Sequence, residues 1–103
     1  MIKEYQKEVD AWFKKKGWEY WGPFEIMTRL TEETGEFARE VLHRYGPKKK
    51  RADQEKGELE EEMGDIIYTL ICFANKHNLD LDKGIKGSID TVTTRDKDRY
   101  NKK

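Results

Sequence analysis

The sequence predicts an all-α fold in which four helices form a bundle. Apolar residues recur at spacings of three and four, glycine or proline separates the periodic segments, and no segment alternates apolar and polar residues as a strand would. With 103 residues the chain has enough apolar material for one modest core. We therefore expect residues 1–103 to form a single domain.

The first helix is expected over Ile2–Lys16, where apolar side chains have the spacing of an amphipathic helix. Gly17 should end it, and residues 18–22 form an aromatic turn. Pro23 then suits the first position of a second helix, because its missing N–H costs nothing there.

The second helix is expected to continue to His43 or Arg44, since Gly46 and Pro47 follow. Steps of three and four define its core-facing row. That row is Ile26, Leu30, Glu33, Phe37 and Val41. An acid thus takes a position where an apolar residue is expected.

A charged loop separates this helix from a third, expected to run from near Gln54 to Lys76 or His77. Its inward row is Leu59, Glu62, Ile66, Leu70 and Phe73. Glu62 therefore interrupts an apolar row just as Glu33 does. Because this helix is apolar on nearly all sides, we expect it to be central, with a subunit interface on its outer face.

The fourth helix is expected from Leu81 to about Ser88, with a possible continuation to Tyr100. Asp80 is a suitable N-cap. Two glycines and the β-branched run of residues 91–94 weaken the helical signal in this segment.

Composition excludes several functional classes. Basic and acidic side chains number 21 each, so no net charge favours a nucleic-acid polymer or a membrane surface as partner. The N-terminus lacks the apolar core of a signal peptide, and the apolar run of residues 66–74 is too short for a membrane span, which predicts a cytoplasmic protein. Cys72 is the only cysteine, so a buried, unreactive thiol is expected rather than an intrachain disulfide.

Two similar acidic clusters are the most informative feature of the chain. Glu32-Glu33-Thr34-Gly35-Glu36 is echoed by Glu61-Glu62-Met63-Gly64-Asp65, 29 positions later. Each places two acids three residues apart, on nearly the same face of a helix. Burying unpaired carboxylates costs several kcal/mol, so partners are required, and all-oxygen ligands suit Mg²⁺ or Mn²⁺.

Magnesium held by carboxylates commonly binds substrate phosphates, which favours phosphoanhydride hydrolysis. The glycine within each cluster further indicates that the two helices approach closely. A non-enzymatic reading stays open, in which the acidic helices are a protein-binding face of a regulatory module.

The motif E-E-x-x-E, a gap of 25 residues and E-x-x-D resembles the signature of the MazG-like nucleotide pyrophosphohydrolases, of the all-α NTP pyrophosphatase superfamily. The short bacterial YpjD-like branch is the most similar, and the resemblance extends over nearly the whole chain. It implies an Mg²⁺-dependent enzyme that cleaves a nucleoside triphosphate to the monophosphate and pyrophosphate. It also implies a homodimer, or a dimer of dimers, that completes the bundle and the site. By the motif, the metal ligands are Glu33, Glu36, Glu62 and Asp65, with Glu32 as a ligand or a base that orients water.

Further residues are candidates for substrate binding. Trp18 and Trp21 could stack on a base or simply close the end of the core. The resemblance gives His43 a base-contacting role and Lys48 a phosphate-binding one, although a helix terminus and a solvated loop are alternatives. Arg95 and Arg99 would share a helical face suited to a triphosphate. Another nucleotide anhydride, such as a dinucleotide or an alarmone, remains an alternative substrate.

Overall fold

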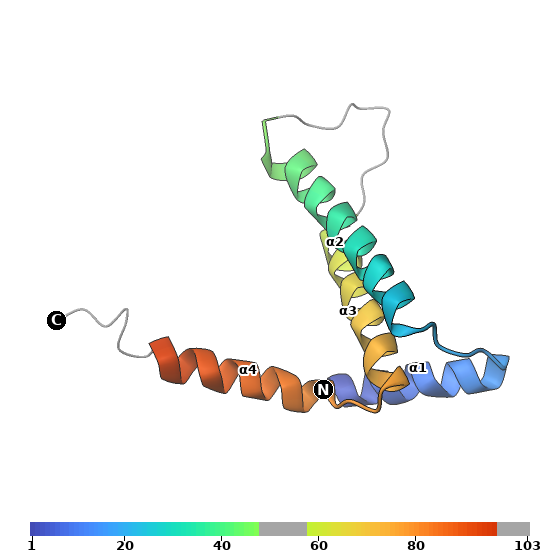
Figure 1. Ribbon diagram of the computed structural model, residues 1–103. Coiled ribbons are helices and arrows are strands. Elements are labelled where there is room, and N and C mark those ends of the chain that lie inside the picture. Colours follow the sequence, from blue (N-terminus) through green and yellow to red (C-terminus); the bar gives the residue numbers. More distant parts are fainter. Residues whose placement is uncertain (48–57, 97–103) are drawn as a thin grey trace.

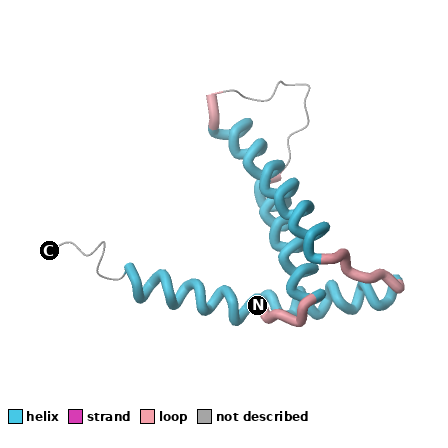
Figure 2. Tube along the Cα trace, viewed as in Figure 1, coloured by secondary structure: helices cyan, strands magenta, loops and turns pink. Residues whose placement is uncertain are grey.

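The computed structural model describes residues 1–47 and 58–96, and helices account for most of them (Figure 1). The helices are α1 (Ile2–Lys16), α2 (Pro23–Tyr45), α3 (Leu59–Lys76) and α4 (Leu81–Asp96). No strand occurs in these two described segments (Figure 2). The prediction of an all-α fold with four helices is confirmed for this part of the chain.

The first two helices have the expected boundaries and the expected signals. Gly17 ends α1 in the left-handed conformation, with φ of 70°, which a glycine adopts without steric cost. Pro23 opens α2, and the N–H of Gly22 donates to Oε1 of Glu25 at 2.9 Å. This bond satisfies a backbone group at the start of the helix, as in a capping box.

The last two helices differ from the prediction. Glu58 has an extended backbone, so α3 begins at Leu59 and the expected helical start near Gln54 is wrong; Gln54 itself lies outside the described residues. Gly57 precedes this position, and glycine disfavours the interior of a helix. α4 is continuous through Gly84, Gly87 and the β-branched run, so it does not break after Ser88.

α2 and α3 lie side by side and antiparallel, and they form the main packing interface of the chain (Figure 1). The buried apolar core of the chain is small and consists of Ile26 from α2 and of Ile71 and Ala74 from α3. Leu70 was expected to face inward but is 37% exposed, whereas Thr69 is buried. Its hydroxyl donates to the carbonyl oxygen of Asp65 at 2.9 Å, so a polar side chain fits this face of α3.

The two glycines of the acidic clusters do not mark a close approach of helices. A Cβ atom added at Gly35 or Gly64 would meet nothing within 4 Å. The close approach expected from these glycines is therefore wrong for contacts within the described chain. Gly64 instead lines an open groove of about 730 Å³ between α1 and α3, together with Trp12 and Ile67.

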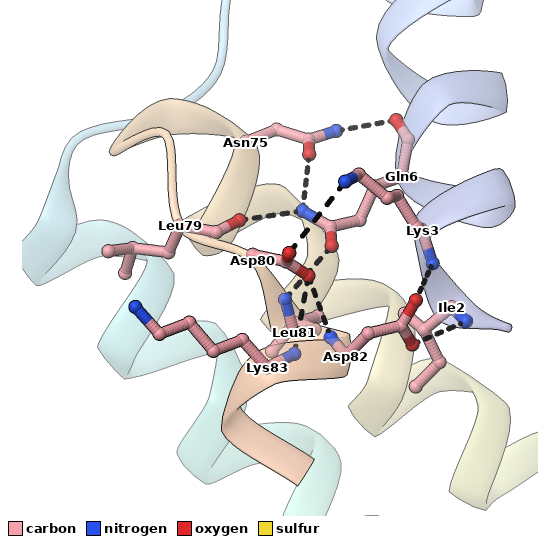
Figure 3. A network of polar contacts seen from close by, with 9 residues as sticks. All are labelled: Ile2, Lys3, Gln6, Asn75, Leu79, Asp80, Leu81, Asp82 and Lys83. Atoms are coloured by element: carbon pink, nitrogen blue, oxygen red, sulfur yellow. Dashed lines mark hydrogen bonds and ion pairs between the residues drawn. The ribbon is translucent and has the colours of Figure 1, made fainter. Parts of the chain in front are cut away.

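α1 lies across the end of the α2 and α3 pair and is joined to it by a buried polar network (Figure 3). Gln6 is buried, and its Nε2 donates to Oδ1 of Asn75 at 3.0 Å and to the carbonyl oxygen of Leu79 at 2.9 Å. Asn75 in turn donates from Nδ2 to the carbonyl oxygen of Gln6 at 2.9 Å. Because both amides are paired on donor and acceptor sides, the network costs little to bury.

α4 is attached through its first turn and then extends away from α2 and α3 (Figure 1). Asp80 caps it as predicted, accepting from the N–H groups of Asp82 and Lys83 at 3.0 and 3.3 Å. The N–H of Leu81 donates to Oε1 of Gln6 at 3.1 Å, which ties α4 to α1 (Figure 3).

The single chain leaves much apolar surface open. Its Cα radius of gyration is 17.6 Å, whereas about 13 Å is typical of a compact domain of this length. α4 buries none of its residues, and Ile85, Ile89 and Val92 form an exposed row along it. Met63 and Ile67 on the outer face of α3 are also exposed. Within the described helices, none is long and apolar enough to cross a membrane.

Candidate active site

The acidic clusters face each other across the packing interface of α2 and α3. Glu33 is only 4% exposed, and Glu36 is half-buried one turn further along α2. Glu62 and Asp65 are half-buried on α3. The prediction that Glu33 and Glu62 take core-facing positions is confirmed by this burial.

Burial and mutual repulsion disfavour the charged forms of two of these acids. Burial raises the pKa of Glu33 above its usual range; Arg29 opposes this shift, while Glu36 and Asp65 add to it. Burial likewise raises the pKa of Glu62, and the charges of Glu36 and Asp65 raise it further. Carboxylates from both helices therefore share one region of negative potential.

Glu40 belongs to the same region, although it was not among the predicted site residues. Its side chain is buried, and its charge contributes to the raised pKa of Glu62. The signal was present in the sequence, because Glu40 lies seven residues after Glu33 and four after Glu36, on the same face of a helix.

The guanidinium of Arg29 lies beside the buried carboxylate of Glu33. Its Nη2 is 3.5 Å from Oε2 of Glu33, and its Nη1 is 3.6 Å from Oε1 of Glu32. The pairing with Glu33 is not a hydrogen bond, since Oε2 of Glu33 is buried without a hydrogen-bond partner. A metal ion was expected as the partner of this acid, and the structure shows that Arg29, four residues earlier, is a basic neighbour as well.

The carboxylates are close enough to influence one another but are not gathered into a finished cage. Over residues 1–47 and 58–96, no three histidine, cysteine or acidic side chains are arranged so that they could hold a metal ion. Bringing the acids onto one ion would require some of them to move, and Glu36, Glu62 and Asp65 are exposed enough to change rotamer.

An aromatic pocket opens next to these acids. It has a volume of about 840 Å³, and Glu33, Asp65 and Arg29 lie at its border. Several aromatic residues and a thiol contribute to its wall. They are Phe13, Trp18, Tyr20, Trp21, Tyr68 and Cys72.

Two tyrosines in this wall were not predicted. Tyr20 donates from its hydroxyl to Oδ1 of Asp10 at 2.9 Å and accepts from Nδ2 of Asn75 at 2.9 Å, so α1 and α3 both hold it. Burial raises the pKa values of Tyr20 and Tyr68 to about 12, and both are neutral phenols at pH 7. Tyr68 follows Asp65 by three residues, the spacing that could have identified it. The half-buried Cys72 fits the expected unreactive thiol, because burial raises its pKa.

The two tryptophans of the pocket have different surroundings. Trp18 packs edge-on against Phe13 and Trp12, with ring centroids 5.6 and 6.1 Å apart. Trp21 is 59% exposed and has no aromatic ring contact within the described segments. Trp18 is itself 53% exposed but is held by two ring contacts, while Trp21 offers a free ring face.

Two further predicted residues, His43 and Arg95, are described by the structure and lie away from this pocket. His43 is half-buried, with Nδ1 lacking a hydrogen-bond partner, and it lies fourteen residues beyond Arg29, about 21 Å along α2. Arg95 lies near the far end of α4, where its guanidinium pairs with Asp96 at 3.1 Å. Within one chain, neither reaches the aromatic pocket. Lys48 and Arg99 lie outside the described residues.

The acidic helix pair matches a known domain. Residues 22–100 match the model of the MazG nucleotide pyrophosphohydrolase domain. The chain belongs to this family. The match includes both acidic clusters and begins at Gly22, so α1 and most of the aromatic turn lie outside it.

Relatives with similar sequences and structures support the same MazG assignment. YpjD from Bacillus subtilis (strain 168) is 42% identical over 99% of this chain and 92% of its own, and YvdC from the same organism is 32% identical over 91% and 94%. The crystal structure of B. subtilis YpjD superposes with a TM-score of 0.80 at 41% identity, covering 93% of this chain and 96% of that one. The crystal structure of the Bacillus-conserved MazG protein, a nucleotide pyrophosphohydrolase, gives a TM-score of 0.74 at 43% identity and 95% coverage of each chain.

Proposed function

We propose that this protein is an Mg²⁺-dependent pyrophosphohydrolase that cleaves nucleoside triphosphates between the α and β phosphates. The observation that carries the proposal is the position of buried Glu33, which lies between an acidic helix interface and an aromatic pocket. A phosphate chain needs cations held by acids, and a base needs a flat apolar surface. The acidic interface would meet the first requirement and the aromatic pocket the second, and the two are adjacent.

The residues present fit the donor chemistry of Mg²⁺. Oε2 of Glu33 is buried without a hydrogen-bond partner, which makes it an available oxygen ligand. Glu36, Glu62 and Asp65 would supply the other carboxylates, and Mn²⁺ could substitute for Mg²⁺. Bound magnesium would neutralise charge that develops on the phosphates during hydrolysis.

The exposed Glu32 is suited to the proton transfer. It lies on the solvent side of Glu33, next to Arg29, and water can reach its carboxylate. We assign it the role of orienting the attacking water and accepting its proton. Hydrolysis at the α phosphorus would then release pyrophosphate and the nucleoside monophosphate.

The pocket is suited to stacking rather than to detailed reading of base edges. Five of its thirteen lining residues are aromatic, and the hydroxyls of Tyr20 and Thr69 already have protein partners. A nucleobase between such rings gains about 1–3 kcal/mol per stack with little discrimination. This supports a broad substrate range, such as housecleaning of the nucleotide pool.

Assembly into a homodimer, or a dimer of dimers, is part of the proposal. The apolar row of α4 and the groove between α1 and α3 are both uncovered in one chain, and symmetric pairing is the commonest way to cover such surfaces. A second copy could also bring His43, Arg95 and the residues outside the described segments to a shared site. Sedimentation equilibrium would test this assembly directly.

The deciding experiment measures pyrophosphate and monophosphate released from a panel of canonical, oxidised and methylated nucleoside triphosphates, with and without Mg²⁺. A dinucleotide and an alarmone belong in the panel, because the metal site would read phosphates in each. E62Q and D65N should lose at least a hundredfold in rate, as expected when a charged contact to the reacting group is removed. E61Q, an exposed neighbour on the same helix, is the matched control.

The outcomes separate the enzyme from a non-enzymatic helical module. Equal rates in E62Q and E61Q would contradict the proposed site. A module would show no site-specific Mg²⁺ binding in calorimetry, and E62Q would leave its metal titration unchanged.

A further inference from the structure

Arg29 lies where the acidic interface and the aromatic pocket meet. It precedes Glu33 by one helical turn, and its side chain also borders the pocket that Trp18 and Trp21 line. Its guanidinium is the positive group nearest to Oε2 of Glu33, at 3.5 Å. It is therefore the cation that offsets the charge of the buried acid in the protein without metal.

The pairing is one that can be exchanged. Oε2 of Glu33 receives no hydrogen bond, so the guanidinium is held by charge alone and not by a two-point fork. The side chain of Arg29 is 52% exposed, and its second contact, with Glu32, is to a carboxylate that is also exposed. Glu33 itself is buried and needs a positive partner, so Arg29 departs only when another cation takes its place. The exposed guanidinium can then be hydrated again, which limits the cost of its departure.

A metal ion and the guanidinium cannot share this oxygen. An ion bound directly to Oε2 of Glu33 would take the position of the arginine's positive charge, and the two cations repel at such distances. The freed guanidinium would remain at the border of the pocket, where planar, two-point binding of phosphate and stacking on aromatic rings are its characteristic interactions.

We propose that Arg29 exchanges partners: it is the counter-ion of Glu33 in the metal-free protein and a ligand of the substrate phosphates once a cation occupies Glu33. This inference rests on the proposed function, since it requires a polyphosphate substrate. Its consequence is cooperation between ligands. Cation binding releases the group that holds the phosphate chain, so the cation and the phosphate chain bind more tightly together than separately.

The test measures binding, not turnover. Calorimetry with Mn²⁺ alone, and with inorganic tripolyphosphate at saturating Mg²⁺, is applied to the wild type and to R29Q, R29K and R39Q. Arg39 is an exposed arginine on the same helix outside the pocket, so R39Q controls for the lost charge. Unfolding in urea verifies that each variant is folded.

We expect R29Q to change the two affinities in opposite directions, with tighter binding of Mn²⁺ and weaker binding of tripolyphosphate. R29Q should bind Mn²⁺ at least about fivefold more tightly, because a cation that competes for the buried Glu33 is gone. It should bind tripolyphosphate about ten- to a hundredfold more weakly, the range of charge-assisted hydrogen bonds. R29K should keep the wild-type affinity for Mn²⁺ but bind tripolyphosphate more weakly, since it lacks the fork. R39Q should match the wild type in both titrations.

Other results overturn the exchange. If R29Q weakens both ligands, Arg29 only positions Glu33; if it changes neither, or if R39Q has the same effect, Arg29 has no specific role. A wild type that binds no Mn²⁺ would refute both the exchange and the proposed function. If R29Q shows the two opposite changes but the wild type releases no pyrophosphate from any nucleotide, the proposed function alone is refuted.

Discussion

Asp82 caps the first turn of α1 although it lies 80 residues from Ile2. Its Oδ1 accepts from the N–H of Ile2 at 2.9 Å, and its Oδ2 accepts from the N–H of Lys3 at 3.2 Å (Figure 3). No side chain near Met1 provides such a cap. The start of α4 thus supplies what the start of α1 lacks.

Removing this cap should destabilise the protein. We expect D82A to lower the free energy of unfolding by about 1 kcal/mol, the usual loss for a helix cap. D90A removes another acid from α4, one that forms an exposed ion pair with Lys86, and it should have a much smaller effect. Urea unfolding measures both variants, and equal losses would contradict a capping role for Asp82.

The different surroundings of the two tryptophans predict different defects. W18A should lower stability by about 1 kcal/mol, because it removes the edge-on contacts of a half-exposed ring with Phe13 and Trp12. W21A should leave stability nearly unchanged and raise KM about tenfold, through loss of one stacking surface. Urea unfolding and steady-state kinetics on the same preparations would distinguish them. A W21A protein with an unaltered KM would exclude Trp21 from substrate binding.

The raised pKa values of Glu33 and Glu62 predict a dependence of stability on pH. Folding raises both above the ordinary value of 4.5, so the folded protein binds more protons than the unfolded chain in the interval above that value. The contribution of these acids to stability therefore falls as pH rises through the interval and returns as pH falls.

The comparison is made without metal, in a chelator, by urea unfolding from pH 4.5 to 8. Relative to the E33Q/E62Q double variant, the wild type should lose stability as the pH rises. E61Q should follow the wild type, because Glu61 is exposed. Parallel curves for the wild type and the double variant would show that folding does not raise the pKa values of these acids. The affinity for Mg²⁺ should also fall in acid, since protons compete for the same oxygens.

Alanine substitutions at Gly35 and Gly64, which both have space for a Cβ atom, test where a second copy of the chain packs. G35A should raise stability by about 0.5–1 kcal/mol, because alanine suits a helix better and its Cβ meets no atom. G64A should do the same in dilute solution but weaken self-association, since Gly64 lines the groove between α1 and α3. Sedimentation measurements over a range of concentrations check the second effect. Unchanged association in G64A would place the interface elsewhere.

Local signals predicted much of the fold. The periodicity of α1 and α2, Gly17, Pro23 and Asp80 each act within one turn of the chain, so their effects are readable in sequence. The start of α3 was misplaced because charged residues before Leu59 are compatible with both helix and loop. The continuity of α4 was equally hard to predict, since weak propensities of opposite sign nearly cancel there.

The site was predictable in its acids but not in its surroundings. An acid on an apolar row is an anomaly that periodicity alone reveals, and this identified Glu33 and Glu62. Tyr20 depends on partners 10 and 55 residues away, so no local pattern could indicate its anchored position. The contact of Arg29 with Glu33 depends on the rotamer of the arginine, which the sequence does not reveal. The roles of these residues in catalysis remain predictions.

The anchoring of Tyr20 has a consequence for how such a protein can evolve. The aromatic wall of the pocket is fastened to α1 and to the end of α3, whereas the acids belong to the packed surfaces of α2 and α3. On the proposed function, substitutions in the turn of residues 18–22 would alter how a base is received while leaving Glu33 and Asp65 in place. A lineage could change its preferred nucleotide through this short segment, with the chemistry inherited intact.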